Sequence, residues 1–199
     1  MRVLDLGCGP GSDLAPWGVD PRDQVTGVDI DEGRLAIART RFPERTFLQG
    51  VGEALPFPDE SFDRIISSVA VPYMNIPQAL AQIYRALAPG GLLSLSLHSP
   101  AFTMGELLHH ALPRPVPTLF RLYVMANGVF FHCTGRTLGL PNGRTESFQT
   151  ERGMRVALTR AGFIDINARR VPGRAGETFL VEARKPARAS LNVAAASTA

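Results

Sequence analysis

Three glycines at alternate positions follow the first apolar run of this 199-residue chain. Gly7, Gly9 and Gly11 lie in the stretch VLDLGCGPG, directly after a run that reads as a buried strand. Glycine at a strand end lets the chain turn sharply and lets a ligand lie against bare backbone. Asp29 closes the next strand-like run, where a carboxylate can accept hydrogen bonds from both hydroxyls of a ribose. Together these features indicate a cofactor that contains a nucleoside.

The spacing of the glycines selects among such cofactors. A dinucleotide-binding loop has the pattern G-x-G-x-x-G and holds a pyrophosphate at a helix N-terminus. Here the pattern is D-x-G-x-G-x-G, and the carboxylate of Asp5 would repel a pyrophosphate but attract an ammonium group. S-adenosylmethionine carries a ribose at one end and an ammonium group at the other. We therefore expect S-adenosylmethionine as the cofactor, and not NAD.

Five sequence blocks in this order resemble those of class I S-adenosylmethionine-dependent methyltransferases, in the small-molecule branch that includes quinone-ring and natural-product enzymes. The blocks are VLDLGCGPG, VTGVDID, GEALPFPDESFD, ALAPGGLL and LTRAGF. The resemblance covers residues 2–98 well and residues 148–184 more loosely. It implies an α/β, doubly wound, Rossmann-like sheet of seven strands in the order 3-2-1-4-5-7-6, with the last strand antiparallel.

The resemblance also implies the contacts to the cofactor. By this resemblance, Asp5 would bind the methionine ammonium group and Asp29 would bind the ribose. The backbone of the glycine loop would line the methionine moiety. Residues at the ends of later strands would contact the adenine and the sulfonium. The implied cofactor-binding residues are Asp5, Gly7, Cys8, Gly9, Gly11, Asp29, Ile30, Val51, Gly52 and Ser68. An alternative role for Asp29 is to cap the helix that begins near Asp31.

Two features depart from the family pattern. Val51 stands where family members commonly carry Asp or Asn to accept from the exocyclic amine of adenine. The chain also starts on its first strand and lacks the one or two helices that in family members usually close over the cofactor. A truncated N-terminus would explain this difference.

Two side chains follow the strands that should flank the transferred methyl group. His98 comes after the fifth strand and can accept a proton near neutral pH, whereas Tyr73 comes after the fourth and is better suited to orient a nucleophile. We expect His98 to act as the general base, with His109, His110 and His132 next in line. Neither the histidines nor the two cysteines have ligand-spaced partners, so no metal site is expected.

The pattern of helices and strands predicts a single domain over residues 1–185. Apolar runs alternate with helical patterns, as parallel βαβ units require. Residues 99–149 interrupt the pattern with five prolines and many apolar side chains, which predicts a lid-like insertion over the active site. Two strand-like runs, 163–171 and 178–184, are joined by a loop too short for a parallel connection. Residues 186–199 are expected to be a disordered tail.

The composition excludes several classes of protein. The net charge is only +3, although residues 101–199 hold 13 basic and 6 acidic side chains against 8 and 12 in residues 1–100. We expect no nucleic-acid partner from this imbalance alone. No secretory signal or membrane helix is visible, so a cytoplasmic protein is expected.

The sequence therefore predicts a methyltransferase that acts on an O, N or C atom of a small, fairly apolar metabolite. The main alternative is a degenerate or truncated module that binds S-adenosylmethionine without turnover. Methylation of nucleic acid or protein is a weaker alternative.

Overall fold

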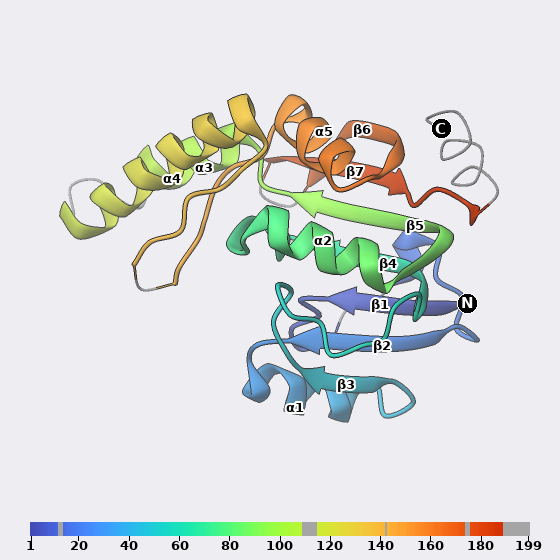
Figure 1. Cartoon of the computed structure of the whole chain (residues 1–199). Helices are drawn as coiled ribbons and strands as arrows, with labels where there is room; N and C mark the ends of the chain where they lie inside the picture. The colour runs from blue at the N-terminus through green and yellow to red at the C-terminus, as the bar shows by residue number, and fades with distance from the viewer. Residues whose placement is uncertain (12–13, 109–114, 142, 174–175, 189–199) are drawn as a thin grey trace, which may run out of the picture.

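The computed structural model describes residues 1–11, 14–108, 115–141, 143–173 and 176–188. Its centre is a seven-stranded sheet in the order β3-β2-β1-β4-β5-β7-β6 (Figure 1). The strands are β1 (Arg2–Leu6), β2 (Gln24–Asp29), β3 (Thr46–Gln49), β4 (Phe62–Ser68), β5 (Leu87–Leu97), β6 (Ile164–Gly173) and β7 (Gly176–Arg184). Neighbours from β3 to β5 are parallel, and β7 is antiparallel to both β5 and β6. The predicted strand order and the antiparallel last strand are confirmed.

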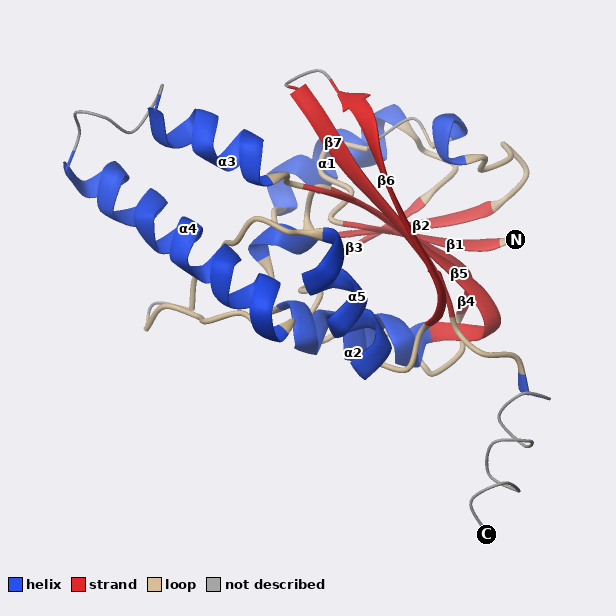
Figure 2. Ribbon diagram, turned by 90° about the horizontal axis from the view of Figure 1, so that it is seen from above, coloured by secondary structure: helices blue, strands red, loops and turns tan. Residues whose placement is uncertain are grey.

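Helices lie on both faces of the sheet (Figure 2). The helical elements are η1 (Ala15–Trp17), α1 (Glu32–Arg41), η2 (Val71–Tyr73), α2 (Ile76–Ala86), α3 (Pro100–Glu106), α4 (Pro115–Thr134) and α5 (Glu151–Arg160). Alternate residues of a strand point to opposite faces. Thus Leu4 and Ile65 join the main core with α2 and α5, whereas Val3 and Ile66 pack with Leu14 beside η1.

Several boundaries differ from what the local sequence indicates. The apolar run SFDRIISSVAV continues to Val71, but β4 ends at Ser68, because Val69 has a positive φ of 59° and the chain turns there into η2. The stretch from Ser12 to Gly18 has the pattern of a helix, but its described residues form only the short η1. The sequence APGG after α2 is of a kind that usually ends a helix, yet it lies within the long β5, which begins at Leu87.

The segment between β5 and α5 projects from one end of the sheet as an arm of α3, α4 and a returning chain (Figures 1 and 2). Asn127 of α4 is buried, and its amide nitrogen donates to the carbonyl oxygens of Leu138 (3.1 Å) and Glu146 (2.9 Å). The Glu146 carboxylate also accepts from Arg121 at 2.6 Å. These bonds fix the returning chain against α4.

No helix in the described ranges combines the length and the apolar character needed to cross a membrane.

The one lysine of the chain fastens β7 to the end of α2. Lys185 is buried, and its ammonium group donates to the carbonyl oxygens of Tyr84 (2.9 Å) and Leu87 (2.7 Å). A cation at this position satisfies carbonyl groups at the end of the helix and interacts favourably with its dipole. Burial lowers the pKa of Lys185, so part of this favourable interaction offsets desolvation.

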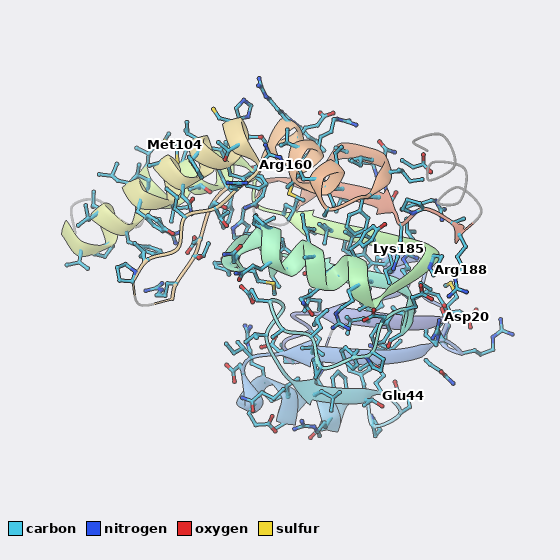
Figure 3. All side chains as sticks on the ribbon, viewed as in Figure 1. Asp20, Glu44, Met104, Arg160, Lys185 and Arg188 are labelled. Atoms are coloured by element: carbon cyan, nitrogen blue, oxygen red, sulfur yellow. The ribbon has the colours of Figure 1, made fainter. Side chains whose placement is uncertain are left out.

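We expect Lys185→Met to lower the free energy of unfolding by about 1.5–3 kcal/mol, since two carbonyl groups lose a charged donor. Urea unfolding measures the loss. Arg188→Ala is the control, because the side chain of Arg188 (Figure 3) is 77% exposed and pairs with Glu60 on the surface. That change should cost less than about 1 kcal/mol. Equal losses in the two variants would contradict a structural role for Lys185.

Candidate functional site

The glycine loop after β1 is held against the end of β2. The backbone N–H groups of Gly7 and Cys8 both donate to the carbonyl oxygen of Val28, at 2.7 and 3.1 Å. Gly7 has φ +74°, and a Cβ atom placed on it would lie 2.1 Å from Cβ of Ala70. The loops that follow β1 and β4 therefore touch where the winding of the sheet reverses, which is the usual place for a ligand in this architecture.

The carboxylate of Asp29 joins the glycine loop to the start of α1. Asp29 is buried, and its Oδ2 accepts from the backbone N–H of Gly9 at 2.8 Å while its Oδ1 accepts from that of Asp31 at 2.9 Å. Asp31 itself is the N-cap of α1 and accepts from the N–H of Arg34. Capping thus falls to Asp31, and each Asp29 oxygen keeps a lone pair for a ligand.

A cavity of about 600 Å³ opens beside this carboxylate, at the carboxyl ends of β1, β2 and β4. Its size lies within the range of small-molecule and cofactor sites. Of the predicted residues, the wall contains Gly7, Asp29, Ile30, Val51, Gly52, Ser68 and Tyr73. The other predicted residues, namely Asp5, Cys8, Gly9, Gly11 and His98, are absent from the wall described by the structure.

Nine further residues of the wall were not predicted from the sequence: Leu6, Val28, Arg34, Gly50, Glu53, Val69, Ala70, Met74 and Gly143. Arg34 comes from the first turn of α1, which faces the glycine loop. A Cβ atom on Gly52 would lie 2.5 Å from Sδ of Met74, so a larger residue there would displace the Met74 side chain from its present position. Gly143 belongs to the returning chain of the arm, which places the arm at the mouth of the cavity.

Asp5 lies behind the glycine loop, only 3% exposed. Burial is the main cause that raises the pKa of its carboxyl group to about 7, and the nearby carboxylate of Asp29 adds to the effect while Arg45 opposes it. Two acids close together in a poorly solvated region favour a cation nearby.

Cys8 is a packing residue of the same loop. It is 2% exposed and packs with Leu35, Ala38 and Phe47. Burial raises the pKa of its thiol to about 12, so the thiolate needed for nucleophilic attack is disfavoured.

An aromatic row leads from the cavity wall into the arm. The rings of Tyr73 and His98 meet edge to face with centroids 5.5 Å apart, and His98 lies 4.3 Å from the ring of Phe102 on α3. The backbone N–H of Gln149 donates to the carbonyl oxygen of His98 at 3.0 Å. The two predicted catalytic side chains are therefore neighbours, with Tyr73 on the cavity side.

The other histidines lie elsewhere. His132 of α4 contacts the hydroxyl of Thr150 through Nδ1 at 2.9 Å. His109 and His110 fall outside the described residues. Within the described ranges, no three His, Cys, Asp or Glu side chains are grouped as a metal ion requires.

Most of the residues that line this cavity lie in a segment that matches a known protein family. Residues 4–95 match the family model described as a methyltransferase domain. Over these residues the chain is similar to that domain. This match confirms the family resemblance that the motifs indicated, and it spans the glycine loop, Asp29 and most of β5.

Two curated relatives are methyltransferases that are named for different substrates. The demethylmenaquinone methyltransferase of Renibacterium salmoninarum is 36% identical over 120 residues, which cover 57% of this chain and 50% of that protein. The malonyl-[acyl-carrier protein] O-methyltransferase of Erwinia pyrifoliae is 40% identical over 97 residues, which cover 48% of this chain and 37% of that protein. The chain thus spans half or less of the length of these relatives.

A solved structure supports the fold along most of the chain. The S-adenosylmethionine-dependent methyltransferase from Mesorhizobium loti superimposes with a TM-score of 0.63 and 22% identity, and covers 92% of this chain and 90% of its own. At this identity the likeness shows the fold, including the region after β5.

The contact between Gly7 and Ala70 gives a matched pair of variants. Both Gly7 and Gly9 have positive φ, but a Cβ atom on Gly9 would have no heavy atom nearer than 3.7 Å. We expect Gly9→Ala to cost about 1–2 kcal/mol of backbone strain. Gly7→Ala adds a steric clash and should cost about 2–5 kcal/mol in all. Chemical unfolding of both proteins measures the difference, and equal costs would mean that the two loops are not in contact.

The buried Asp5 predicts a particular dependence of stability on pH. Its pKa lies at about 7 in the folded chain against an ordinary 3.8, so between these values the unfolded chain loses a proton that the folded chain keeps. The free energy of unfolding therefore falls as pH rises through this window. We expect Asp5→Asn to stabilise the ligand-free protein above pH 7 by up to about 4 kcal/mol, and not at pH 4.

Urea unfolding at pH 4 and pH 8 measures this effect. Asp20 is the control, because its hydrogen bond to Arg22 on the surface lowers the pKa of the Asp20 carboxyl group. Asp20→Asn should give no stabilisation at pH 8. A stability difference for Asp5→Asn that is the same at both pH values would contradict the buried, protonated carboxyl group.

Proposed function

We propose that this chain binds S-adenosylmethionine in the 600 Å³ cavity and transfers its methyl group to an O, N or C atom of a small molecule. The observation that carries the proposal is the meeting of Gly7, Asp29 and Ile30 in one cavity wall, at the point where the sheet reverses its winding. The family match over residues 4–95 supports it. We assign residues 1–185 to one methyltransferase domain, with residues 99–149 as its lid.

The wall residues suit the parts of this cofactor. Asp29 would accept from the ribose hydroxyls with its remaining lone pairs. Ile30 is 69% exposed on the cavity wall and would cover one face of the adenine. Val51 and the backbone of Gly52 would lie along the adenine edge, and Ser68 would lie near the sulfonium.

The residues behind the wall would act indirectly. Cys8, Gly9 and Gly11 shape the loop whose backbone lines the methionine moiety. Asp5 would attract the methionine ammonium through the loop, because a cation favours the ionised form of a carboxyl group whose pKa is otherwise raised by burial. Binding of the cofactor should therefore release a proton from Asp5 near neutral pH.

The cofactor supplies a methyl group that its positive sulfur already activates, so the chain has to align the acceptor and exclude water. Tyr73 would orient the acceptor from the cavity wall. His98, behind the Tyr73 ring, would accept the proton of an acceptor that is poorly acidic. The arm would close the site from the side of Gly143.

The acceptor we propose is a small molecule with an apolar body. Methylation of a demethylated menaquinone, the substrate named for one relative, fits this description, while the other relative acts on a malonyl group carried by a protein. Delivery by a carrier protein would still present a small acceptor to the cavity. We place the reaction in the cytoplasm and propose no nucleic-acid substrate.

Calorimetric titration with S-adenosylmethionine, its demethylated product S-adenosylhomocysteine and NAD tests the proposal. We expect the first two to bind and NAD to bind more weakly or not at all. Asp29→Ala should weaken both sulfur compounds by about 1.5–3 kcal/mol, the usual range for lost hydrogen bonds to a charged group.

Asp31→Ala is the matched control, since it removes an adjacent carboxylate that caps α1 but is not in the cavity wall. The affinity of the Asp31→Ala variant for S-adenosylmethionine should stay within about threefold of that of the unchanged protein, because the loss of a helix cap lowers helix stability and removes no contact to the cofactor. Tighter binding of NAD, or equal effects of the two substitutions, would overturn the assignment of this cavity to S-adenosylmethionine.

A further inference from the structure

The outward face of α4 is apolar, although it is exposed. The exposed residues of this helix over 119–134 are Leu119, Leu122, Ala126, Val129 and Cys133, which we call the α4 stripe. Leu119 is 71% exposed and Val129 is 56% exposed. A helix on the surface of a domain ordinarily carries charged and polar side chains on its exposed face. The α4 stripe therefore has the character of a contact surface.

The spacing of the α4 stripe indicates what kind of surface would cover it. Its members follow one another at intervals of three, four, three and four residues. This alternation averages about 3.5 residues, which is the period of the seam between two helices in a coiled coil. The stripe runs as one narrow line for about 20 Å along the helix. Such a line fits a second helix that has an apolar line of its own.

The α4 stripe points away from the rest of the chain. Val124, Asn127 and Phe131 are buried on the other side of α4, where Asn127 holds the returning chain. The helices α3 and α5 also pack along α4 (Figure 2). None of the stripe residues belongs to the described wall of the cofactor cavity. The stripe is therefore available to another molecule without any change in the arm.

The charge of α4 favours a second copy of the chain over a lipid surface. Helices that lie in a membrane interface are rich in Lys and Arg on their polar face. Arg121 is the only formally charged residue in the sequence of α4, and it pairs with Glu146 at 2.6 Å. A stripe without charge meets its own copy without repulsion. A two-fold axis would set α4 of each copy against α4 of the other, so that both stripes are covered.

The size of the α4 stripe also fits a pair of copies. Contact between two such stripes would bury on the order of 1,000 Å² in total, which is near the lower limit for a specific interface. Ala126 at the middle of the stripe would let the two helix axes approach to about 8 Å. An interface of this size predicts a reversible dimer with a dissociation constant in about the micromolar range.

We propose that two copies of this chain associate through α4, stripe against stripe, around a two-fold axis. The inference is independent of the proposed methyl transfer, because the stripe and the cofactor cavity share no residue. The arm then has two faces with separate tasks. Its inner face holds the returning chain, and its outer face holds the second copy.

Sedimentation velocity of the full chain over a wide range of concentrations tests the inference. The buffer contains a reducing agent, so that a disulfide through the exposed Cys133 does not contribute. We expect a monomer at low concentration that converts to a dimer as the concentration rises. Leu122→Glu should raise the dissociation constant about tenfold or more, because a carboxylate from each copy would be buried in the seam. Circular dichroism checks that this variant is folded.

Ile37→Glu is the matched control, because Ile37 of α1 is 52% exposed against 51% for Leu122 and the change adds the same charge. This variant should keep the dimer. A monomer at every concentration, an unchanged dissociation constant in Leu122→Glu, or equal losses in the two variants would overturn the inference. Binding to phosphatidylcholine vesicles that Leu122→Glu abolishes would also overturn it, by assigning the stripe to a lipid surface. If S-adenosylmethionine fails to bind while the dimer forms as expected, the proposed function fails and this inference stands.

Discussion

The Asp29 carboxylate is the interaction on which the cofactor cavity depends. Its two oxygens accept from the N–H groups of Gly9 and Asp31, so one buried side chain fixes both the glycine loop and the approach to α1. Because β2 pairs with β1, Val28 also presents its carbonyl oxygen to Gly7 and Cys8. The end of β2 therefore determines the shape of the loop after β1. A ligand that binds Asp29 meets a wall that is already ordered, and this lowers the entropic cost of binding.

The same arrangement carries an electrostatic cost. Asp5 and Asp29 are both buried, and the burial of Asp5, together with the nearby carboxylate of Asp29, disfavours the ionised form of Asp5. A stable fold alone would avoid such a pair, and an apolar residue at position 5 would pack as well in the centre of a parallel sheet. The cost is offset if a cation binds next to the loop, since the carboxyl group of Asp5 then ionises favourably. The strain between these two acids thus agrees with a cationic ligand better than with a pyrophosphate.

Local patterns were sufficient to predict the frame of the structure but not all of the cavity wall. Strand order and the positions of Gly7, Asp29 and Ile30 follow from motifs that are contiguous in sequence. Arg34, Met74 and Gly143 reach the wall only because α1, the loop after η2 and the arm fold back over it, and no short-range pattern reports such contacts. The APGG sequence has the local pattern of a helix end but lies within a strand. Gly90, at φ +78°, is accommodated within β5, where its N–H donates to the carbonyl oxygen of Lys185.

The chain that returns from the arm also positions the two residues proposed to act on the acceptor. Residues 145–149 are mostly buried, and the N–H groups of Ser147 and Gln149 donate to the carbonyl oxygens of Pro72 and His98. This segment therefore fixes η2, which carries Tyr73, and the end of β5, which carries His98, and it is itself held by Arg121 and Asn127 of α4. The proposed cofactor contacts come from residues at the ends of the strands, whereas the groups proposed to act on the acceptor are held by the arm. Substitutions in α4 can then change which acceptor is methylated while the affinity for the cofactor stays the same.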